Sequence, residues 1–365
     1  MTAIYTDRQN ENDKKGNQEG RIAVAILGAT GSVGQRFIQL LEYHPWFRLH
    51  ELVASERSAG RTYHDAADWR LETLMPDHAA GLTIKPLGAD LESPLVFSGL
   101  DSSVAGEAED EYASRGCAVI SNSKNHRMDA DVPLLVPEVN ADHLAAIELQ
   151  RKRRKGFIVT NPNCSVVGLA MALAPLERAF GIEAVHVTTM QAISGAGYSG
   201  VASYSILDNV IPYIGGGEEE KIESEPRKIL GTWADGRFSD AELTISAQVN
   251  RVPTIDGHLM TISAKLRNQA SLDGVRAAIE SFSGEPQGRK LPSAPTHPLH
   301  YIDRPDRPQP RLDRDREGGM AVSVGRLRSC PILDIRLVAL VHNTIRGAAG
   351  AAILNAELLK ARGVI

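Results

Sequence analysis

The sequence predicts a two-domain α/β protein, in which a doubly wound parallel sheet is followed by an α+β domain with a mixed, largely antiparallel sheet. The chain has 365 residues, which is long for one domain and suits two of ordinary size. Before residue 156, continuous apolar strands alternate with helical segments, as in parallel β–α–β units. After that residue the strands are longer and alternate in polarity, as in antiparallel sheets.

The composition indicates a folded protein that acts on small molecules. Hydrophobic residues make up 42% of the chain, which is enough for substantial cores and excludes wholesale disorder. The chain has 45 acidic and 40 basic residues, and the resulting net charge of −5 does not favour nucleic acid as a partner. The basic run Arg151–Lys155 is expected to be a solvated turn between two elements.

The cysteines and the N-terminus indicate the compartment. Three scattered cysteines are too few for a disulfide framework, and the sequence has no CxxC pair of the kind that suggests a zinc site. We therefore expect a cytoplasmic protein without a metal. Residues 1–20 are polar and contain no apolar signal sequence, so we expect a flexible tail. The longest apolar stretch, around Ser165 to Leu176, is too short to span a membrane.

The first domain is expected to span residues 21–155. Ile22–Leu27 is a continuous apolar run, typical of a strand buried on both faces, and Gly28–Gly34 follows it as Gly-Ala-Thr-Gly-Ser-Val-Gly. Apolar residues then recur at helical spacing until Pro45 stops the helix. Further strands are expected at Leu49–Ala54, Leu95–Ser98 and Ala118–Ser121.

The second domain is expected to span residues 156–342. It opens with a strand, Phe157–Thr160, a turn that ends at Cys164, and a helix, Ser165–Leu173. Tyr301–Gly319 is rich in Arg, Asp and Pro and is expected to be an extended loop. The Ala-rich C-terminal segment is expected to be helical, and residues 343–365 are expected to pack back on the first domain. The longer strands are expected at Ala184–Ile193, Leu243–Val249, His258–Leu266 and Ile332–Val341.

The glycine segment is the first strong functional signal. It lies between a buried strand and an amphipathic helix, which is the context of a Rossmann-type dinucleotide-binding domain. The glycines allow a tight turn, and the helix N-terminus offers N–H donors to a diphosphate. The second strand ends in Ala-Ser-Glu-Arg-Ser, which suits the 2′-phosphate of NADP, although Glu56 leaves dual use of NAD open. The expected cofactor contacts are Gly28, Thr30, Gly31, Ser32, Val33, Ser55, Arg57, Ser58 and Ser98.

Cys164 is the second strong signal. It lies between a predicted strand and the first turn of a predicted helix, whose N-terminus is expected to stabilise a thiolate and lower the thiol pKa. Backbone N–H groups there, together with the Asn163 amide, are expected to bind an oxyanion. Cys117 and Cys330 lack this setting and are expected to be ordinary buried cysteines.

A thiol nucleophile needs a proton acceptor. His258 follows Asp-Gly and opens a strand, so we expect it to project from a turn at a sheet edge. Arg251 lies seven residues earlier, and the pair is expected to bracket a small anionic substrate. The glycine turn 215–217 leads into an acidic helix with Lys221, and spacing alone favours an exposed helix over one that faces a polar substrate.

In combination, these features resemble the aspartate-β-semialdehyde dehydrogenases, in the branch found in archaea and fungi. The resemblance runs from about Arg21 to the C-terminus. The motifs that carry it are Gly28–Gly34, Asp131–Asn140 (DVPLLVPEVN), Asn161–Ser165 (NPNCS), Gln191–Gly197 (QAISGAG), Glu218–Lys221 (EEEK), and Arg251–Pro253 with Gly257-His258.

The resemblance implies a role for each matching residue. Cys164 would be the acylated nucleophile, His258 the acid–base, and Gln191 would orient the acyl group. Arg251 would bind the substrate carboxylate, and an acid, Glu219, would bind its ammonium. The phosphate would be held by Asn163, Lys221 and Arg127, and the residues near the nicotinamide would be Ser194, Gly195 and Asn343.

The implied reaction is the reversible, NADP-dependent reductive dephosphorylation of L-aspartyl-4-phosphate to L-aspartate 4-semialdehyde through a cysteine thioester. Its product feeds lysine, methionine and threonine synthesis, and the family forms homodimers or homotetramers. An acyl-CoA reductase on the same scaffold, such as a malonyl-CoA reductase, is an alternative, and aspartyl phosphate is favoured because Glu219 offers a partner to the substrate ammonium. A catalytically silent NADP-binding regulator is an alternative of another class, in which Cys164 and His258 are incidental.

Overall fold

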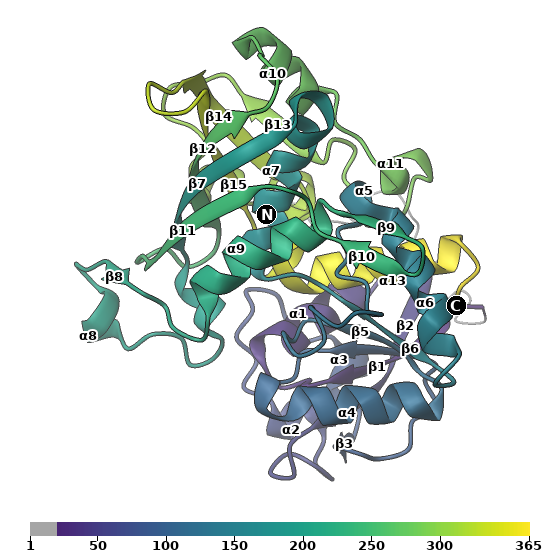
Figure 1. Ribbon diagram of the computed structural model, residues 1–365. Coiled ribbons are helices and arrows are strands. Elements are labelled where there is room, and N and C mark those ends of the chain that lie inside the picture. The colour runs from purple at the N-terminus through teal and green to yellow at the C-terminus, as the bar shows by residue number, and fades with distance from the viewer. Residues whose placement is uncertain (1–19) are drawn as a thin grey trace.

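The computed structural model describes residues 20–365, so the predicted tail lies outside the described residues except for Gly20. Figure 1 shows a parallel sheet in the lower half of the molecule and a second sheet in the upper half. The helices α7 (Cys164–Phe180) and α13 (Gly350–Ala361) lie between the two sheets.

The first sheet has six parallel strands in the order β3-β2-β1-β4-β5-β6. The strands β4 and β5 have the predicted bounds and are fully buried, as expected where helices cover both faces of a sheet (Figure 1). The strands are β1 (Ile22–Leu27), β2 (Phe47–Ala54), β3 (Ile84–Pro86), β4 (Leu95–Ser98), β5 (Ala118–Ser121) and β6 (Phe157–Thr160). The helices in this half are α1 (Ser32–Leu41), α2 (Tyr63–Ala66), α3 (Asp77–Ala80), α4 (Ser102–Arg115), α5 (Pro137–Asn140), η2 (Ala141–Ala146) and α6 (Ile147–Arg151).

The chain leaves the first sheet later than predicted. We expected β6 to open the second domain, but it pairs in parallel with β5, with Phe157 opposite Ala118. A short, fully buried strand carries no sequence signal for the sheet that it joins, because packing selects its partner. The chain therefore reaches the second sheet only after α7.

The second sheet has seven strands in the order β13-β14-β15-β12-β7-β11-β8. The strand β12 pairs antiparallel with β7 and β15, whereas β11 pairs in parallel with β7, so the predicted mixed, largely antiparallel sheet is confirmed. Because β12 is an interior strand, the prediction that His258 lies at a sheet edge is wrong. The strands are β7 (Ile182–Gln191), β8 (Ile211–Pro212), β11 (Thr244–Arg251), β12 (His258–Leu266), β13 (Leu299–Ile302), β14 (Val322–Ser329) and β15 (Ile335–Val341), and a separate hairpin has β9 (Thr232–Ala234) and β10 (Arg237–Ser239).

The segment predicted as an extended loop, Tyr301–Gly319, contains the end of β13 and two helical turns, α12 (Pro310–Asp313) and η4 (Arg316–Gly319). The buried carboxylate of Asp313 organises it by accepting hydrogen bonds from Arg307, Arg316 and the Gln309 backbone. The many charged and Pro residues of this segment predicted a loop. The segment is compact instead, because its charged side chains pair with one another.

Helices cover one face of the second sheet. The helix α7 packs on β12 and β15, α9 on β11, and α10 on β13 (Figure 1). The opposite face carries exposed residues at alternate positions of β7, β11 and β12. The helices in this half are η3 (Ile193–Ala196), α8 (Ser203–Ile206), α9 (Glu218–Ile229), α10 (Leu272–Glu280), α11 (Glu285–Gly288) and η5 (Ile345–Ala349).

The C-terminal helix returns to the first sheet. On α13, Ile353 and Leu354 belong to the same buried apolar cluster as Val24 and Phe97 of the parallel sheet. The π-helical turn η5 connects β15 to α13 and passes beside the start of α7. Residues 342–365 therefore connect the second sheet to the core of the first.

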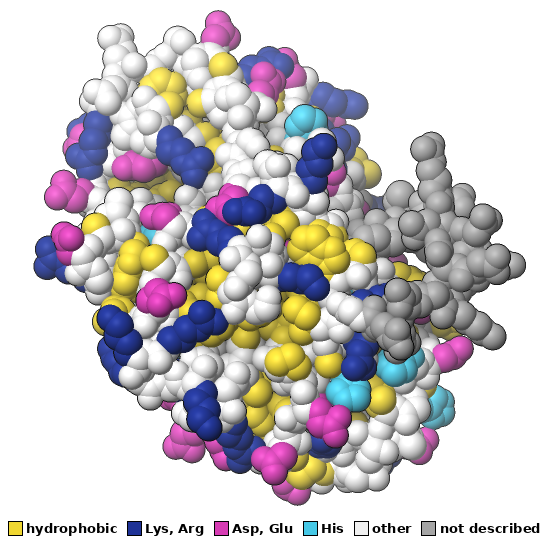
Figure 2. Space-filling model, turned by 90° about the vertical axis from the view of Figure 1, so that its right-hand side faces the viewer, with side chains coloured by type: hydrophobic (Ala, Val, Ile, Leu, Met, Phe, Trp, Pro, Cys, Tyr) yellow, Lys and Arg dark blue, Asp and Glu magenta, His cyan; other side chains and the backbone are white. Residues whose placement is uncertain are grey.

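The basic run Arg151–Lys155 forms the predicted turn between α6 and β6. Arg151 donates to the carbonyl of Val364, while Arg153 and Arg154 pair with acidic side chains. Figure 2 shows a face of the molecule on which basic side chains are scattered among hydrophobic and acidic ones. The ion pairs of Arg153 and Arg154 partly neutralise the charge of the basic run.

Candidate active site

Cys164 is the first residue of α7, directly after the turn that follows β6. The Asn163 side chain caps this helix, because its Oδ1 accepts hydrogen bonds from the backbone N–H groups of Ser165, at 2.9 Å, and Val166. The turn η5 presses against the cysteine, and a Cβ at Gly347 would lie 2.9 Å from the Cys164 Cβ. The backbone on both sides of the thiol is therefore fixed.

His258 is the partner of this thiol. Its Nε2 lies 3.2 Å from the Cys164 Sγ, and the imidazole is fully buried. Its Nδ1 accepts the backbone N–H of Ala192 at 3.0 Å, and a backbone N–H can only donate, so the neutral ring carries its proton on Nε2. Burial lowers the pKa of His258 to about 3, with the positive charge of Arg251 and the neighbouring His342 acting in the same direction. The imidazole thus presents an N–H donor to the sulfur.

The thiol pKa differs from the prediction. Burial raises the pKa of Cys164 to about 12 in the site without substrate, and the Glu218 carboxylate adds to this effect. The guanidinium groups of Arg251 and Arg127 lower the pKa but do not offset the burial. Our expectation that the helix N-terminus gives this thiol a low pKa is therefore wrong for the resting site.

This shift predicts how Cys164 reacts with an alkylating reagent. Below its pKa a thiol gains about tenfold more thiolate per pH unit, so iodoacetamide should react about tenfold faster per unit between pH 7 and 9. The measurement uses a Cys117→Ser/Cys330→Ser background, in which Cys164 is the only thiol. A rate that levels off below pH 8 would show that the thiolate is already formed there.

Two further predicted residues meet at the ends of neighbouring strands. Gln191 ends β7 and Arg251 ends β11, and the parallel register places them opposite each other. The Arg251 Nη1 donates to the Ala192 carbonyl at 2.6 Å. A Cβ at Gly195 would lie 2.8 Å from this Nη1 and 3.1 Å from the His258 ring, so a larger residue there would displace the Arg251 guanidinium. The Arg251 guanidinium and the His258 imidazole therefore both lie beside Gly195 in the site.

The acid that joins this site is Glu218, not the predicted Glu219. The Glu218 Oε1 accepts hydrogen bonds from the amides of Asn163, at 2.9 Å, and Gln191, at 3.0 Å, and its Oε2 lies 3.2 Å from the Lys221 Nζ. Glu219 instead accepts the backbone N–H of Val249, on β11. The sequence has three glutamates in a row, and only the rotation of the helix about its axis decides which of them faces the site. The available signal was Lys221, three residues after Glu218, because residues at this spacing lie on the same face of a helix.

The predicted phosphate ligands lie around the same turn. The Arg127 Nη1 forms a 2.8 Å ion pair with Glu225, whose other oxygen accepts the backbone N–H of Asn163 at 2.7 Å. Lys221 is one helical turn after Glu218 and is partly exposed. Glu225 was not predicted, since nothing in the sequence marks it as different from its acidic neighbours.

The glycine segment forms a tight strand-to-helix turn. Gly28 has a φ of +75°, and a Cβ there would lie 2.7 Å from the Gly99 carbonyl oxygen. A Cβ at Gly34 would lie 2.3 Å from the Gly28 carbonyl oxygen. Gly31 is the N-cap residue before α1 and has no side chain, so the first N–H groups of the helix, at Ser32 and Val33, have no side-chain acceptor at this cap. This is the geometry that a diphosphate requires.

Other predicted cofactor residues fall into two groups. Ser55 and Arg57 are exposed in the turn after β2, and the buried Ser58 closes this turn by donating its N–H to the Ser55 carbonyl. The Ser98 hydroxyl is fully buried and donates to Glu109 on α4 at 2.6 Å, so the structure turns its side chain away from the expected role.

A loop of the second domain meets the glycine turn. The Asn343 amide donates to the Ser194 hydroxyl at 2.8 Å, and its Oδ1 accepts the N–H of Gly257, so the predicted nicotinamide residues lie together beside His258. The hydroxyl of Tyr198, four residues after Ser194, donates to the Gln35 side chain on α1 at 3.2 Å. The region between the Cys164 site and the dinucleotide turn is thus bounded by both domains.

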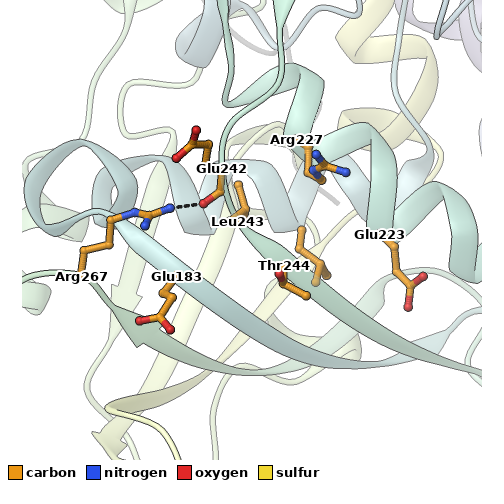
Figure 3. A pocket seen from close by; sticks show the side chains of 8 residues that line it. Glu183, Glu223, Arg227, Glu242, Leu243, Thr244 and Arg267 are labelled. Carbon is orange, nitrogen blue, oxygen red and sulfur yellow. Dashed lines mark hydrogen bonds between the residues drawn. The ribbon is translucent and has the colours of Figure 1, made fainter.

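A hollow of about 610 Å³ lies elsewhere, where α9 meets the first residues of β7 and β11 (Figure 3). Thr244 lines it, seven positions or about 23 Å along β11 from Arg251. The hollow is therefore separate from the Cys164 site. The other lining residues are Glu183, Glu223, Arg227, Glu242, Leu243, Ile245 and Arg267.

Two classes of feature are not found in residues 20–365. No group of three or more His, Cys, Asp or Glu side chains in this range is arranged to hold a metal ion. Nor does this range contain a helix that combines the length and the apolar character needed to cross a membrane.

Two family models match the chain. The model described as "Semialdehyde dehydrogenase, NAD binding domain" matches residues 23–147. The model described as "Semialdehyde dehydrogenase, dimerisation domain" matches residues 173–346. Together they cover the second sheet and all of the first sheet except β6 and the first residue of β1.

Curated relatives and solved structures agree with these models. An aspartate-semialdehyde dehydrogenase from Schizosaccharomyces pombe is 50% identical over 94% of this chain and 99% of its own length. One from Methanothermobacter thermautotrophicus is 47% identical over 93% and 99%. The crystal structure of the Candida albicans aspartate-semialdehyde dehydrogenase with NADP has a TM-score of 0.88 and 46% identity, covering 94% of this chain and all of that one. The resemblance to fungal and archaeal enzymes stated from the motifs is confirmed.

Proposed function

This chain belongs to the aspartate-semialdehyde dehydrogenase family, and on that premise we propose that it catalyses the NADP-dependent, reversible conversion of L-aspartyl-4-phosphate to L-aspartate 4-semialdehyde and phosphate. The observation that carries this proposal is the 3.2 Å contact between the Cys164 Sγ and the His258 Nε2. Arg251 and Glu218 flank this pair with opposite charges, as an amino-acid substrate requires.

The chemistry of the chain's own residues follows from this geometry. The Cys164 thiol gives up its proton to water, because the His258 Nε2 that faces it already carries one. The thiolate then attacks the acyl carbon, the bond from that carbon to the phosphate oxygen breaks, and a thioester remains on Sγ. NADPH, when bound, supplies the hydride that reduces this thioester. The carbonyl oxygen becomes negative, and the His258 Nε2–H is placed to donate to it, as the acid part of its acid–base role. Cleavage of the carbon–sulfur bond then releases the aldehyde and restores the thiolate.

The substrate-binding roles divide between the charged side chains. Arg251 binds the substrate carboxylate, and Glu218 binds its ammonium, in place of the Glu219 that we first expected. Gln191 orients the acyl group, and its hydrogen bond to Glu218 supports this role. Arg127, Lys221 and Asn163 hold the phosphate. A substrate ammonium beside Glu218 would also offset the negative charge that raises the thiol pKa.

A matched pair of variants tests the acid. Glu218→Gln keeps an oxygen acceptor for Asn163 and Gln191 but loses the charge, so the KM for aspartate semialdehyde should rise about 10- to 100-fold. Glu219→Gln keeps an acceptor for the Val249 N–H and should change this KM less than about twofold. If the Glu219 variant shows the larger rise, the assignment to Glu218 is wrong.

The residues present fit NADP. The glycines of the turn have no side chains, so the backbone there can come close to the dinucleotide. Ser55 and Arg57 are exposed at the end of β2, where a 2′-phosphate would lie. Gly28, Thr30, Gly31, Ser32 and Val33 would hold the diphosphate side. Gly195, with Ser194 and Asn343, would lie near the nicotinamide.

Changing Arg57 to Glu should separate the two dinucleotides. The KM for NADPH should rise about 10- to 100-fold, because attraction to the 2′-phosphate becomes repulsion, while that for NADH should change less than about threefold. The neighbouring Glu56→Gln is the control and should preserve the preference. Equal losses for both dinucleotides would remove Arg57 from the 2′-phosphate site.

The assay that tests the function follows NADPH formation from aspartate semialdehyde and phosphate. Malonyl-CoA with NADPH is run beside it, because an acyl-CoA reductase would use the same thiol. We expect activity only with the semialdehyde. A silent regulator would bind NADP and turn over neither substrate.

We also propose a homodimer, with a homotetramer as the larger alternative. No helix within residues 20–365 covers the face of the second sheet opposite α7, and His186, Ser246, Gln248 and Thr261 are exposed on it. The matched family model for this region is described as a dimerisation domain. Light scattering on the eluted protein should give about twice the chain mass of 39.5 kDa, and a mass of one chain would refute the proposal.

We propose a cytoplasmic location for the enzyme. Cys117, Cys164 and Cys330 are all unpaired, as in a reducing compartment, and a free Cys164 thiol is needed for the reaction. Fractionation of the source cells, with the activity followed in each fraction, tests this.

A further inference from the structure

The helix α9 presents four charged residues on one face. Glu218, Lys221, Glu225 and Lys228 are spaced by three or four residues, and Glu218, Glu225 and Lys228 are buried. The proposed reaction uses the first two. The second pair, about two turns further along the helix, has no role in it so far.

Glu225 joins two parts of the site. Its side chain is almost fully buried, and each carboxylate oxygen has a different partner. Oε1 accepts from the Arg127 Nη1 at 2.8 Å, and Oε2 accepts the backbone N–H of Asn163 at 2.7 Å. One carboxylate therefore sets the distance between the anion-binding guanidinium and the turn that carries Cys164.

Lys228 holds the backbone that carries Arg127. Its Nζ donates to three carbonyl oxygens, of Arg127 and Asp129 at 2.8 Å and of Val132 at 2.9 Å. The ammonium lies 4.3 Å from the centre of the Phe238 ring. Burial lowers the pKa of Lys228 to about 8, partly offset by Asp129 and further acidic groups, so keeping this cation inside the protein costs free energy.

Arg127 keeps donors free for a ligand. Its Nη1 pairs with Glu225 and its Nη2 donates to the Asn122 carbonyl. Its Nε is buried, and no hydrogen-bond acceptor for it is found within residues 20–365. Only 7% of the residue is exposed, so its orientation is set by these neighbours.

We infer that Glu225 and Lys228 are positioning residues that fix Arg127, through its side chain and its backbone, at the distance from Cys164 that phosphate needs. The helix α9 acts as one rigid spacer, because the same face also holds Glu218 against Asn163 and Gln191. The inference rests on the proposed function for the identity of the anion as phosphate. It predicts that loss of the spacer weakens phosphate binding selectively.

The test compares Lys228→Met with Arg227→Met in the full-length enzyme. Arg227 is the adjacent residue on α9, lines the separate hollow of Figure 3, and its Nη2 lies 3.8 Å from an Asp240 carboxylate oxygen. Two quantities are measured: the KM values and kcat of semialdehyde oxidation, and the phosphate concentration that half-protects Cys164 from iodoacetamide. The second needs no turnover, so it still tests the anion site if the proposed activity is absent.

We expect Lys228→Met to raise the KM for phosphate and the half-protecting concentration about tenfold. The KM for aspartate semialdehyde and kcat should change less than about twofold, and Arg227→Met should match the wild type. If the Met variant does not fold, Lys228→Gln, which is neutral but still a donor, is measured instead with the same expectation. Phosphate constants equal to those of Arg227→Met, or an equal rise of every constant, would overturn the inference.

Glu225→Gln supplies the second arm. Its amide group must face either Arg127 or the Asn163 N–H, donor against donor, so one of the two contacts is lost. Since Glu225 also touches the cysteine turn, we expect a tenfold rise in the KM for phosphate together with a fall in kcat. A fall in thermal stability with unchanged phosphate constants would show a purely structural role and contradict the inference.

Discussion

Replacing Cys164 with serine is expected to lower kcat by about three orders of magnitude or more, while NADP binding stays nearly intact. A serine hydroxyl at this position would have to ionise in a buried site beside Glu218, where even the thiol has a pKa raised to about 12. The dinucleotide turn, Gly28–Gly34, lies in the other domain and is not altered. Steady-state rates and NADPH fluorescence titration measure the two effects separately.

The other two cysteines provide the control for this experiment. Cys117 is buried at the start of β5 and Cys330 lies in the turn between β14 and β15, so neither is near the site. Cys117→Ser and Cys330→Ser should keep most of the activity. A Cys164→Ser enzyme with a near-normal rate would refute covalent catalysis.

The second large effect is expected for His258→Asn. The Asn side chain is shorter than imidazole and does not place a donor at the Nε2 position, so kcat should fall by roughly two to four orders of magnitude. The KM values should change little, because Arg251, Glu218 and Arg127 remain in place. Arg251→Lys is the contrasting variant: it loses the planar fork and should mainly raise the KM for aspartate semialdehyde.

The pH dependence separates these roles. A group with a pKa lowered to about 3 is already neutral at pH 5, so His258 should contribute no limb to the wild-type profile between pH 5 and 9. The Cys164 thiol, with its pKa raised, should make kcat/KM rise with pH over the same range. A limb near pH 6.5 that disappears in His258→Asn would show that the imidazole titrates during catalysis, contrary to this expectation.

The site could be predicted only in part from the sequence. Cys164, His258, Gln191 and Arg251 stand in motifs whose spacing is fixed by strand ends and turns, and the structure brings them together. The choice among Glu218, Glu219 and Glu220 depends on the rotation of one helix about its axis, which packing sets. The buried positioning pair, Glu225 and Lys228, lies in an acidic helix that looks exposed in the sequence.

By itself, the sequence determined the strand–glycine–helix start, the mixed second sheet and the placing of a cysteine at a helix N-terminus, because each depends on local periodicity and turn residues. Only the tertiary structure decided that β6 joins the first sheet, that His258 lies inside the second, and that the thiol pKa rises. These properties depend on what surrounds a residue in space. A helix N-terminus favours a thiolate wherever it occurs, but the free energy of removing that thiolate from water is set by the whole site.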